Sequence, residues 1–287
     1  MTLQAVAIGV AIVLAGTIPR NIVFAANLRY FTGFPWAVPV MAAYMFVFWR
    51  YLNGDGPPES TAAERRAGFR ANRISGRVWA ASLIAGGLGL VALVVALRLA
   101  NRLVVLPPQA LPDLSDVPRA TVLALLLMGA PIAGIVEEAA FRGYMQRPIE
   151  QAHGIWLAIL ISGTMFALVH LDFTPILWPY YMAVAAIYGT VAYFADSILP
   201  AVVLHTSGNV YSNLDLWLHG QAEWQAPAGQ QLLVLTTGPD RAFWTETGLL
   251  LVLIIAMVLA YRTLAVVSGF SRTRGGAGVK AESTGSA

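Results

Sequence analysis

The sequence predicts an all-α, polytopic integral membrane protein: a bundle of about eight transmembrane helices that encloses a polar cavity within the membrane. Three observations lead to this prediction. The 287-residue chain is 57% hydrophobic and only 11% charged, whereas a soluble protein carries about 25% charged residues. Its mean hydropathy is +0.66. Several apolar runs approach the ~20 residues that a helix needs to cross a bilayer.

The composition also excludes several kinds of chemistry. There is no cysteine, so disulfides, thiolate metal ligands and a cysteine nucleophile are ruled out. The formal net charge is +3, and the basic residues are nearly all arginine. We interpret this excess as a membrane-topology signal and expect no nucleic-acid partner. The N-terminus lacks the pattern of a secretory signal, so we expect the first apolar run to remain as a helix.

Eight apolar runs are predicted to span the membrane. They are residues 3–27 with a kink near Pro19, 34–52, 79–100, 121–136, 155–171, 175–195, 198–211 and 243–261. An even number of spans returns both termini to one side. The polar segment 53–76 is rich in arginine, so the positive-inside rule assigns it and both termini to the cytoplasm. We interpret segment 53–76 as a solvated topology determinant.

Two further segments are predicted to lie between spans. Residues 101–119 form a proline-containing connector, in which Asp113, Ser115 and Asp116 are candidate N-caps for the helix that follows. Residues 213–240 are too polar to span.

The sequence IVEEAAFRGYMQR at residues 135–147 puts three charged side chains in or beside an apolar helix. A charge at the centre of a membrane helix costs ~2.5–3.5 kcal/mol on insertion scales, so these charges need partners or a function. Glu138 and Arg142 are four residues apart and share a helical face, so we expect them to pair. Glu137 is turned about 100° away, which leaves it free to face a cavity.

Two later spans carry polar residues at the same spacing. Phe166 and His170 lie in FALVH, and His205 and Asn209 lie in HTSGN, so each pair shares one helical face. A lone intramembrane histidine is readily explained as a hydrogen-bonded packing residue. Three polar clusters on three neighbouring spans favour a shared polar cavity.

A residue count indicates whether these clusters can meet. If the acidic helix continues several residues past Arg142 and the chain reverses near 152–154, Glu137 and His170 both lie about 24–26 Å from the turn. His205 lies only ~12 Å from the turn that precedes it. Glu137, His170 and His205 can therefore lie at the same depth in the membrane only if the turn at 152–154 projects further from the bundle than the turn before His205.

The residues Glu137, His170, His205 and Asn209 form a set capable of hydrolysis. A carboxylate and an imidazole that converge on one water can activate it for attack. A second imidazole and a carboxamide can donate hydrogen bonds to a developing oxyanion. Apolar surroundings would raise the pKa of the glutamate towards neutrality. Since cysteine is absent and no serine lies in a nucleophile elbow, water is the expected nucleophile.

The same residues are also candidate metal ligands. Two histidines and a glutamate (Glu137, His170 and His205) are a familiar zinc set with a fourth position for water. Here the three ligands come from three helices and not from an HExxH pair. The spacing therefore leaves open both a zinc-dependent and a metal-free mechanism.

The order of the three motifs resembles that of a known family. EExxxR at 137–142, FxxxH at 166–170 and HxxxN at 205–209 are the pattern of the CPBP family of intramembrane proteases, which includes CAAX prenyl proteases and abortive-infection or bacteriocin-processing membrane proteins. The resemblance covers about residues 134–213. It carries nothing for the first 110 residues or for the tail. The apolar runs predict a single transmembrane domain over 1–267, with a catalytic core at about 120–213 where the motifs lie, and we expect residues 268–287 to form a disordered tail.

The resemblance also implies roles for the motif residues. Those matching Glu137 and His170 activate water, and those matching His205 and Asn209 stabilise the oxyanion. The residue matching Glu138 supports the site with Arg142, while Phe166 either lines the substrate path or packs beside it.

The expected activity is therefore that of a CAAX-type endopeptidase. Eukaryotic relatives remove the last three residues of prenylated CAAX proteins, so the expected substrate is a membrane-associated protein, prenylated or not, cut near its C-terminus. The alanine- and arginine-rich, lysine-poor composition is typical of a GC-rich prokaryote and indicates a prokaryotic plasma membrane.

Two other readings use the same residues. One is a non-catalytic membrane scaffold or bacteriocin-immunity factor of the same fold, although a scaffold has no need of both histidines and Glu137. The other is a proton-coupled transporter, since glutamate and histidine chains also relay protons. The paired broken helices that would favour a transporter are not evident in the sequence. The expected partners are the lipid bilayer and a protein or peptide substrate, and the sequence predicts no oligomeric state.

Overall fold

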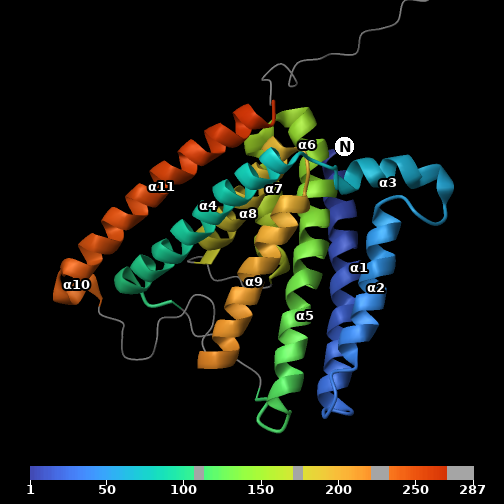
Figure 1. Ribbon diagram of the computed structural model, residues 1–287, viewed down its shortest axis with the longest axis horizontal. Coiled ribbons are helices and arrows are strands. Elements are labelled where there is room, and N and C mark those ends of the chain that lie inside the picture. Colours follow the sequence, from blue (N-terminus) through green and yellow to red (C-terminus); the bar gives the residue numbers. More distant parts are fainter. Residues whose placement is uncertain (107–112, 171–176, 221–232, 270–287) are drawn as a thin grey trace, which may run out of the picture.

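A computed structural model describes residues 1–106, 113–170, 177–220 and 233–269, and these residues form helices joined by turns and loops (Figure 1). The main elements in chain order are α1 (Thr2–Arg29), α2 (Ala37–Leu52), η1 (Glu59–Thr61), α3 (Ala62–Phe69), α4 (Gly76–Leu103), α5 (Arg119–Glu137), η2 (Glu138–Met145), α6 (Gln146–His153), α7 (Ile155–Val169), α8 (Trp178–Ala195), α9 (Leu199–His219), α10 (Val234–Thr237) and α11 (Arg241–Val267). The predicted all-α membrane class is confirmed. Most of the predicted tail lies outside the described residues, so its disorder stays a prediction.

Four helices are long and apolar enough to cross a membrane: α1, α4, α11 and the continuous helix through α5, η2 and α6. Helices α2 and α7 are apolar but shorter. Helices α8 and α9 have 18 and 21 residues, but tyrosine, histidine and asparagine side chains make them less apolar. The estimate of eight spans therefore stays a prediction.

The helices form a bundle in which α9 packs along α5, and α11 packs along α4 on the outside (Figure 1). The described part of α11 buries one side chain, that of Leu264, so nearly all of this helix faces outward. The start of α1 and the end of α11 lie at the same end of the bundle, as an even number of spans predicts (Figure 1).

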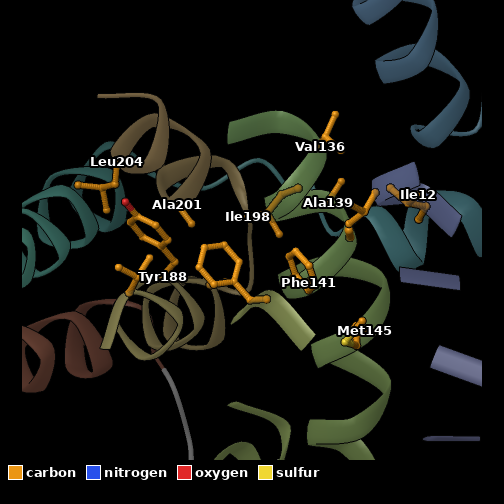
Figure 2. Packing of buried hydrophobic residues seen from close by; sticks show 14 of the residues in the cluster. Ile12, Val136, Ala139, Phe141, Met145, Tyr188, Ile198, Ala201 and Leu204 are labelled. Atoms are coloured by element: carbon orange, nitrogen blue, oxygen red, sulfur yellow. The ribbon is translucent and has the colours of Figure 1, made fainter. Parts of the chain in front are cut away.

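Helix α1 approaches the acidic helix closely because two of its contact residues are glycines. A Cβ atom at Gly16 would collide with the side chain of Val136, and one at Gly9 would lie 2.7 Å from Cε of Met145. Small residues let membrane helices pack at short range. Figure 2 shows Ile12 of the same helix beside Ala139 in this buried contact.

The acidic helix continues well past Arg142, as predicted. Helical structure runs from Arg119 to His153, and the chain reverses at Gly154, where a φ of +86° favours glycine. The sequence did not predict that Glu138–Met145 is a π-helix. Such segments are rare and occur frequently at functional sites.

Helix α9 is longer than the predicted span and continues unbroken through His205. Its polar last turns are held by α5: Asn213 Nδ2 donates to the carbonyl of Leu126 at 2.8 Å, and Trp217 Nε1 donates to that of Arg119 at 3.3 Å. The prediction that this helix ends near residue 211 is wrong, because contacts with another helix stabilise a segment whose composition resembles a loop.

The predicted N-caps of α5 are also wrong. The helix begins directly after Pro118, and no side chain caps it. Asp113 Oδ1 instead accepts a hydrogen bond from the backbone N–H of Ser115 at 3.0 Å. This local turn ends before the helix begins, so the aspartate is used within the connector.

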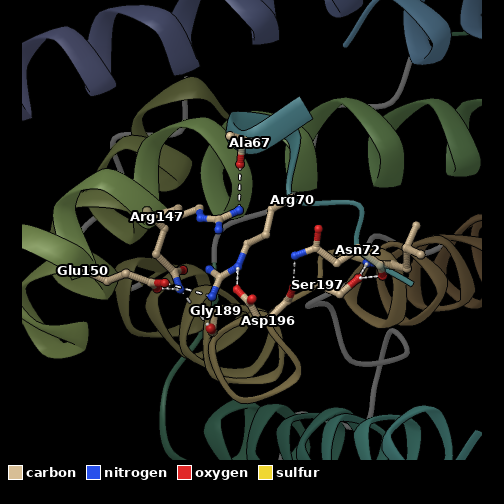
Figure 3. Close-up of polar contacts among 10 residues, drawn as sticks. Ala67, Arg70, Asn72, Arg147, Glu150, Gly189, Asp196 and Ser197 are labelled. Carbon is tan, nitrogen blue, oxygen red and sulfur yellow. Dashed lines mark hydrogen bonds and ion pairs between the residues drawn. The ribbon is translucent and has the colours of Figure 1, made fainter. Parts of the chain in front are cut away.

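Segment 53–76 is not merely a solvated topology determinant. It contains α3, in which Phe69 is fully buried. Arg70, which is 2% exposed, lies 2.8 Å from Oε1 of Glu150 through Nη2 and donates to Oδ1 of Asp196 through Nε at 3.1 Å (Figure 3). The interpretation failed because both partners of Arg70 lie far away in the sequence. The same contacts attach the end of α6 to the turn after α8.

Candidate active site

The centre of the site is a buried group of three side chains, Glu138, Arg142 and His205. Glu138 is fully buried, and its Oε1 accepts a hydrogen bond from Nη1 of Arg142 at 3.0 Å, which is the pair predicted from the sequence. The same oxygen lies 2.7 Å from Nδ1 of His205. An ionised carboxylate only accepts hydrogen bonds, so Nδ1 of His205 carries the proton and donates it.

The other ring nitrogen of His205 faces the second glutamate. Nε2 lies 3.8 Å from Oε2 of Glu137. The two adjacent glutamates therefore share one imidazole as a neighbour, which the sequence did not predict. The imidazole from α9 enters between them, and because its two nitrogens point in different directions, it reaches both carboxylates.

The two carboxylates nevertheless differ in exposure. The side chain of Glu137 is 16% exposed, while that of Glu138 is 0% exposed. Oε2 of Glu137 makes no hydrogen bond within the described part of the chain. Glu137 is thus the carboxylate that a water or substrate can reach, and Glu138 is held inside.

Aromatic rings surround the guanidinium of Arg142. This side chain is 1% exposed, and its Cζ lies 4.9 Å from the ring centroid of Phe166 and 5.4 Å from that of Tyr188. A guanidinium over an aromatic face is stabilised by the ring quadrupole. The rings therefore assist Glu138 in keeping the charge of Arg142 inside the bundle.

Phe166 connects the two histidines. Its ring centroid lies 4.7 Å from that of His170 and 6.2 Å from that of His205, and it packs edge-on against Phe141 at 5.4 Å. The side chain is 3% exposed. Of the two positions considered for Phe166, the packing position is the one observed.

His170 follows the last residue of α7 and is exposed. Its Nδ1 lies 2.7 Å from the carbonyl oxygen of Phe166. A carbonyl only accepts hydrogen bonds, so Nδ1 is protonated and Nε2 presents a lone pair. His170 lies beside Phe166 because the two residues are four apart along the same segment. The hairpin was predicted to bring His170 to Glu137, and no hydrogen bond or ion pair joins these two residues in the regions described.

Asn209 lies one turn after His205 on α9 and is half-buried. Its carboxamide makes no hydrogen bond to any described residue. The structure thus brings His205 to Glu137 directly, and it leaves Asn209 further along the same helix.

Comparison with known proteins gives one match. Residues 119–211 match the family model described as type II CAAX prenyl endopeptidase Rce1-like. This segment, called the CAAX-protease segment below, is similar to that family. Neither the curated proteins nor the solved structures contain a match to the chain. The CAAX-protease segment includes every residue singled out by the three motifs, and the predicted resemblance is confirmed there.

The zinc site considered from the sequence stays a prediction. Within the described ranges, no group of three or more His, Cys, Asp or Glu side chains is gathered as a metal site. Nδ1 of His205 donates to Glu138, and its Nε2 lies 3.8 Å from Oε2 of Glu137, an arrangement that histidines use both in metal sites and without a metal. We derive no step through a metal.

Two residues near the site were missed by the sequence analysis. Tyr188 of α8 stacks on His205 with centroids 4.9 Å apart and an interplanar angle of 17°, and nothing in the sequence set it apart from the other tyrosines of α8. Arg20 of α1 lies outside the CAAX-protease segment and interacts electrostatically with Glu137. Arg20 could have been noticed from the sequence, because it is a charged residue within an apolar run.

Proposed function

We propose that this protein is an intramembrane endopeptidase that hydrolyses a peptide bond near the C-terminus of a membrane-associated protein, with water as the nucleophile. The observation that carries the proposal is the imidazole of His205 between two unlike carboxylates. Glu138 is fully buried and paired with Arg142, whereas the side chain of Glu137 is 16% exposed. Each carboxylate has one buried oxygen without a hydrogen bond among the described residues, so exposure is what distinguishes them.

In the proposed reaction, Glu137 takes one proton from a water molecule while the water oxygen attacks the carbonyl carbon of the scissile bond. The C–N bond then breaks, and the proton passes to the leaving amine. The water supplies the new oxygen of the product carboxylate, so no oxidant or other co-reactant is needed.

In this proposal, Glu138 orients His205, the histidine that faces the general base Glu137. By accepting the Nδ1 proton of His205, it fixes the ring so that Nε2 faces Glu137. A carboxylate that holds an imidazole in one tautomer is a recurring device of hydrolytic sites. With Nδ1 protonated, Nε2 accepts hydrogen bonds, so His205 stabilises the proton that Glu137 takes from water.

His170 and Asn209 are assigned more remote tasks. Nε2 of His170 has no hydrogen bond to a described residue and lies on the opposite side of the ring from Nδ1, which the carbonyl of Phe166 holds. This suits a second contact with water or substrate. Asn209 supplies a carboxamide donor one turn from His205, which suits an oxyanion. Both roles, for His170 and for Asn209, follow the family resemblance. In each case the hydrogen-bond partner would be the bound substrate or water.

The substrate class also follows from the family. We propose a membrane-anchored protein tail, with a prenylated CAAX peptide as the first candidate, in a prokaryotic plasma membrane with both termini in the cytoplasm. The arginine-rich segment 53–76 supports this orientation through the positive-inside rule.

The test uses purified full-length protein, a Glu137→Gln variant and a Glu59→Gln control, in which the substituted residue is exposed. Each is incubated with a farnesylated CAAX peptide and with unprenylated membrane-protein tails, and mass spectrometry measures release of the C-terminal fragment. We expect Glu137→Gln to lose about 10²–10⁴-fold in rate, as for other general bases, while the control cleaves normally.

The same assay separates the other readings. Absence of cleavage by the wild-type protein on every substrate would favour a scaffold or immunity factor, and proton flux in vesicles that requires Glu137 would favour a transporter. Repeating the assay after treatment with a chelator tests whether a metal is needed. We propose a metal-free reaction, so the cleavage rate should be unchanged by the chelator. Loss of activity that zinc restores would contradict that part of the proposal.

A further inference from the structure

A cavity lies away from the candidate active site, at the end of the bundle where α3 lies beside the N-terminus and above the end of α2 (Figure 1). Residues of α1, α2, α3 and α6 line it. Its volume is about 670 Å³, within the ~300–1,000 Å³ of typical small-molecule sites. Ile8 and Ile12 of α1 and Leu52 of α2 form part of its apolar wall. Its polar rim comes from α3 and α6.

Two arginines of this rim lack acidic partners. Arg65 is 7% exposed, and its Nη2 donates to the carbonyl of Gly56 at 2.7 Å, while its Nε and Nη1 make no hydrogen bond within the described residues. Arg147 donates through Nη1 to the carbonyl of Ala67 at 2.7 Å (Figure 3). Neither guanidinium forms an ion pair in the described part of the structure.

The charges of the cavity lining favour an anion. The charged side chains of the lining are Arg65, Arg147 and Glu64, and Met1 also lines the cavity, so the lining carries an excess of positive charge. A buried charge such as that of Arg65 is costly unless it is paired. A ligand with a negative charge would reduce this excess.

The apolar wall restricts the ligand further. A small inorganic anion would leave the isoleucine and leucine surfaces uncovered, and a neutral lipid would leave the guanidiniums without a counter-charge. A molecule that combines one negative charge with an acyl chain satisfies both ends. Basic pockets between transmembrane helices are known to bind anionic lipid headgroups.

We propose that this cavity binds one anionic phospholipid, with its phosphodiester at Arg65 and Arg147 and an acyl chain along Ile8, Ile12 and Leu52. The bound lipid would bridge α1, α2 and α6 to α3. The inference does not depend on proteolysis, because the cavity and the candidate active site are lined by different residues.

The test compares phosphatidylglycerol with phosphatidylcholine added to full-length protein in uncharged detergent. Thermal unfolding and native mass spectrometry are the readouts. We expect one retained phosphatidylglycerol and a midpoint about 4 °C higher than with phosphatidylcholine, as for a tight ligand of the native state. Equal shifts with the two lipids would overturn the proposal.

Three variants locate the site. Arg147→Gln removes one headgroup contact, and Ile8→Trp fills the apolar part without changing the charge; both should lose the phosphatidylglycerol-specific shift. Arg50→Gln is the matched control, since Arg50 is exposed and pairs with Asp55 outside the cavity, and it should keep the shift. If all three variants respond alike, the lipid is binding elsewhere and the proposal is wrong. Comparison of each variant without lipid separates loss of binding from misfolding.

Discussion

The protein contains two nearly fully buried arginine–glutamate pairs that resemble each other in chemistry and differ in their surroundings. At the centre of the bundle, Arg142 contacts Glu138 through one nitrogen, with side chains 1% and 0% exposed. At the end of the bundle, Arg70 contacts Glu150, with side chains 3% and 7% exposed, and contacts Asp196 through a second nitrogen. The terminal arginine therefore has two acidic partners, and the central arginine has one.

The difference between these two pairs shows that a buried ion pair can either hold helices together or position a catalytic side chain. The contacts of Arg70 join α3, α6 and the turn after α8, so they attach separate elements. The carboxylate of Glu138 is shared between Arg142 and His205, so the central pair orients an imidazole that faces Glu137. A buried ion pair that lacks some of its hydrogen bonds lowers the stability of the fold. For Glu138 and Arg142, this loss of stability is explained if the site performs a reaction.

The largest effect in this comparison is expected from Arg142→Met. Removing one partner of a buried pair costs about 3–5 kcal/mol, because Glu138 is left charged without its cation. Thermal or denaturant unfolding would measure the loss, and cleavage should fall as well, since Arg142 no longer holds Glu138, the acceptor of His205, in place. A variant within about 1 kcal/mol of the wild type would contradict the assigned role, since that is the range of exposed pairs.

The double variant Glu138→Gln with Arg142→Met sharpens this result. Replacing both members by neutral groups removes the uncompensated charge and should recover part of the stability. Activity should stay low, because a carboxamide holds His205 less firmly than a carboxylate does. Recovery of both properties would show that the pair serves packing alone.

A smaller effect is expected from Arg70→Met. We expect a stability loss of about 2–3 kcal/mol, because Asp196 is half exposed and water can solvate it. Gln146 still donates to Glu150 at 3.1 Å, which limits the penalty further. Cleavage measured well below the melting temperature should remain close to the wild-type rate. A rate as low as that of Arg142→Met would erase the distinction between the two pairs.

The smallest effect belongs to an exposed pair, Arg102 with Asp240, which are 2.6 Å apart. The hydrogen bond from Arg102 lowers the pKa of the Asp240 carboxyl below its ordinary value of 3.8. Because the folded-state pKa is depressed, any stabilisation is present at neutral pH and is lost as the pH falls through that lowered pKa.

Asp240→Asn should therefore unfold like the wild type. Asparagine still caps α11, where Asp240 accepts from the N–H of Phe243. Melting curves between about pH 3 and pH 7 would measure any difference, which should disappear at the acidic end. A large loss of stability in Asp240→Asn at neutral pH would mean that solvent screens the Arg102–Asp240 ion pair less than its exposure indicates.

The sequence alone determined the features that depend on local spacing and composition. Apolar runs gave the membrane class, and the spacing of Glu138 and Arg142 gave their pair, because residues four apart meet on any helix. The continuation of the acidic helix to a hairpin and the three-motif resemblance were likewise available before any coordinates.

Only the tertiary structure decided which side chains meet across the bundle. Nothing in the spacing indicated that His205 enters between Glu137 and Glu138, that Arg70 reaches Glu150 and Asp196, or that the acidic stretch is a π-helix. These contacts join residues far apart in the sequence, and their geometry depends on how close α9 and α3 approach the acidic helix. That approach is set by small residues and helix packing, whose consequences appear only when the helices are assembled.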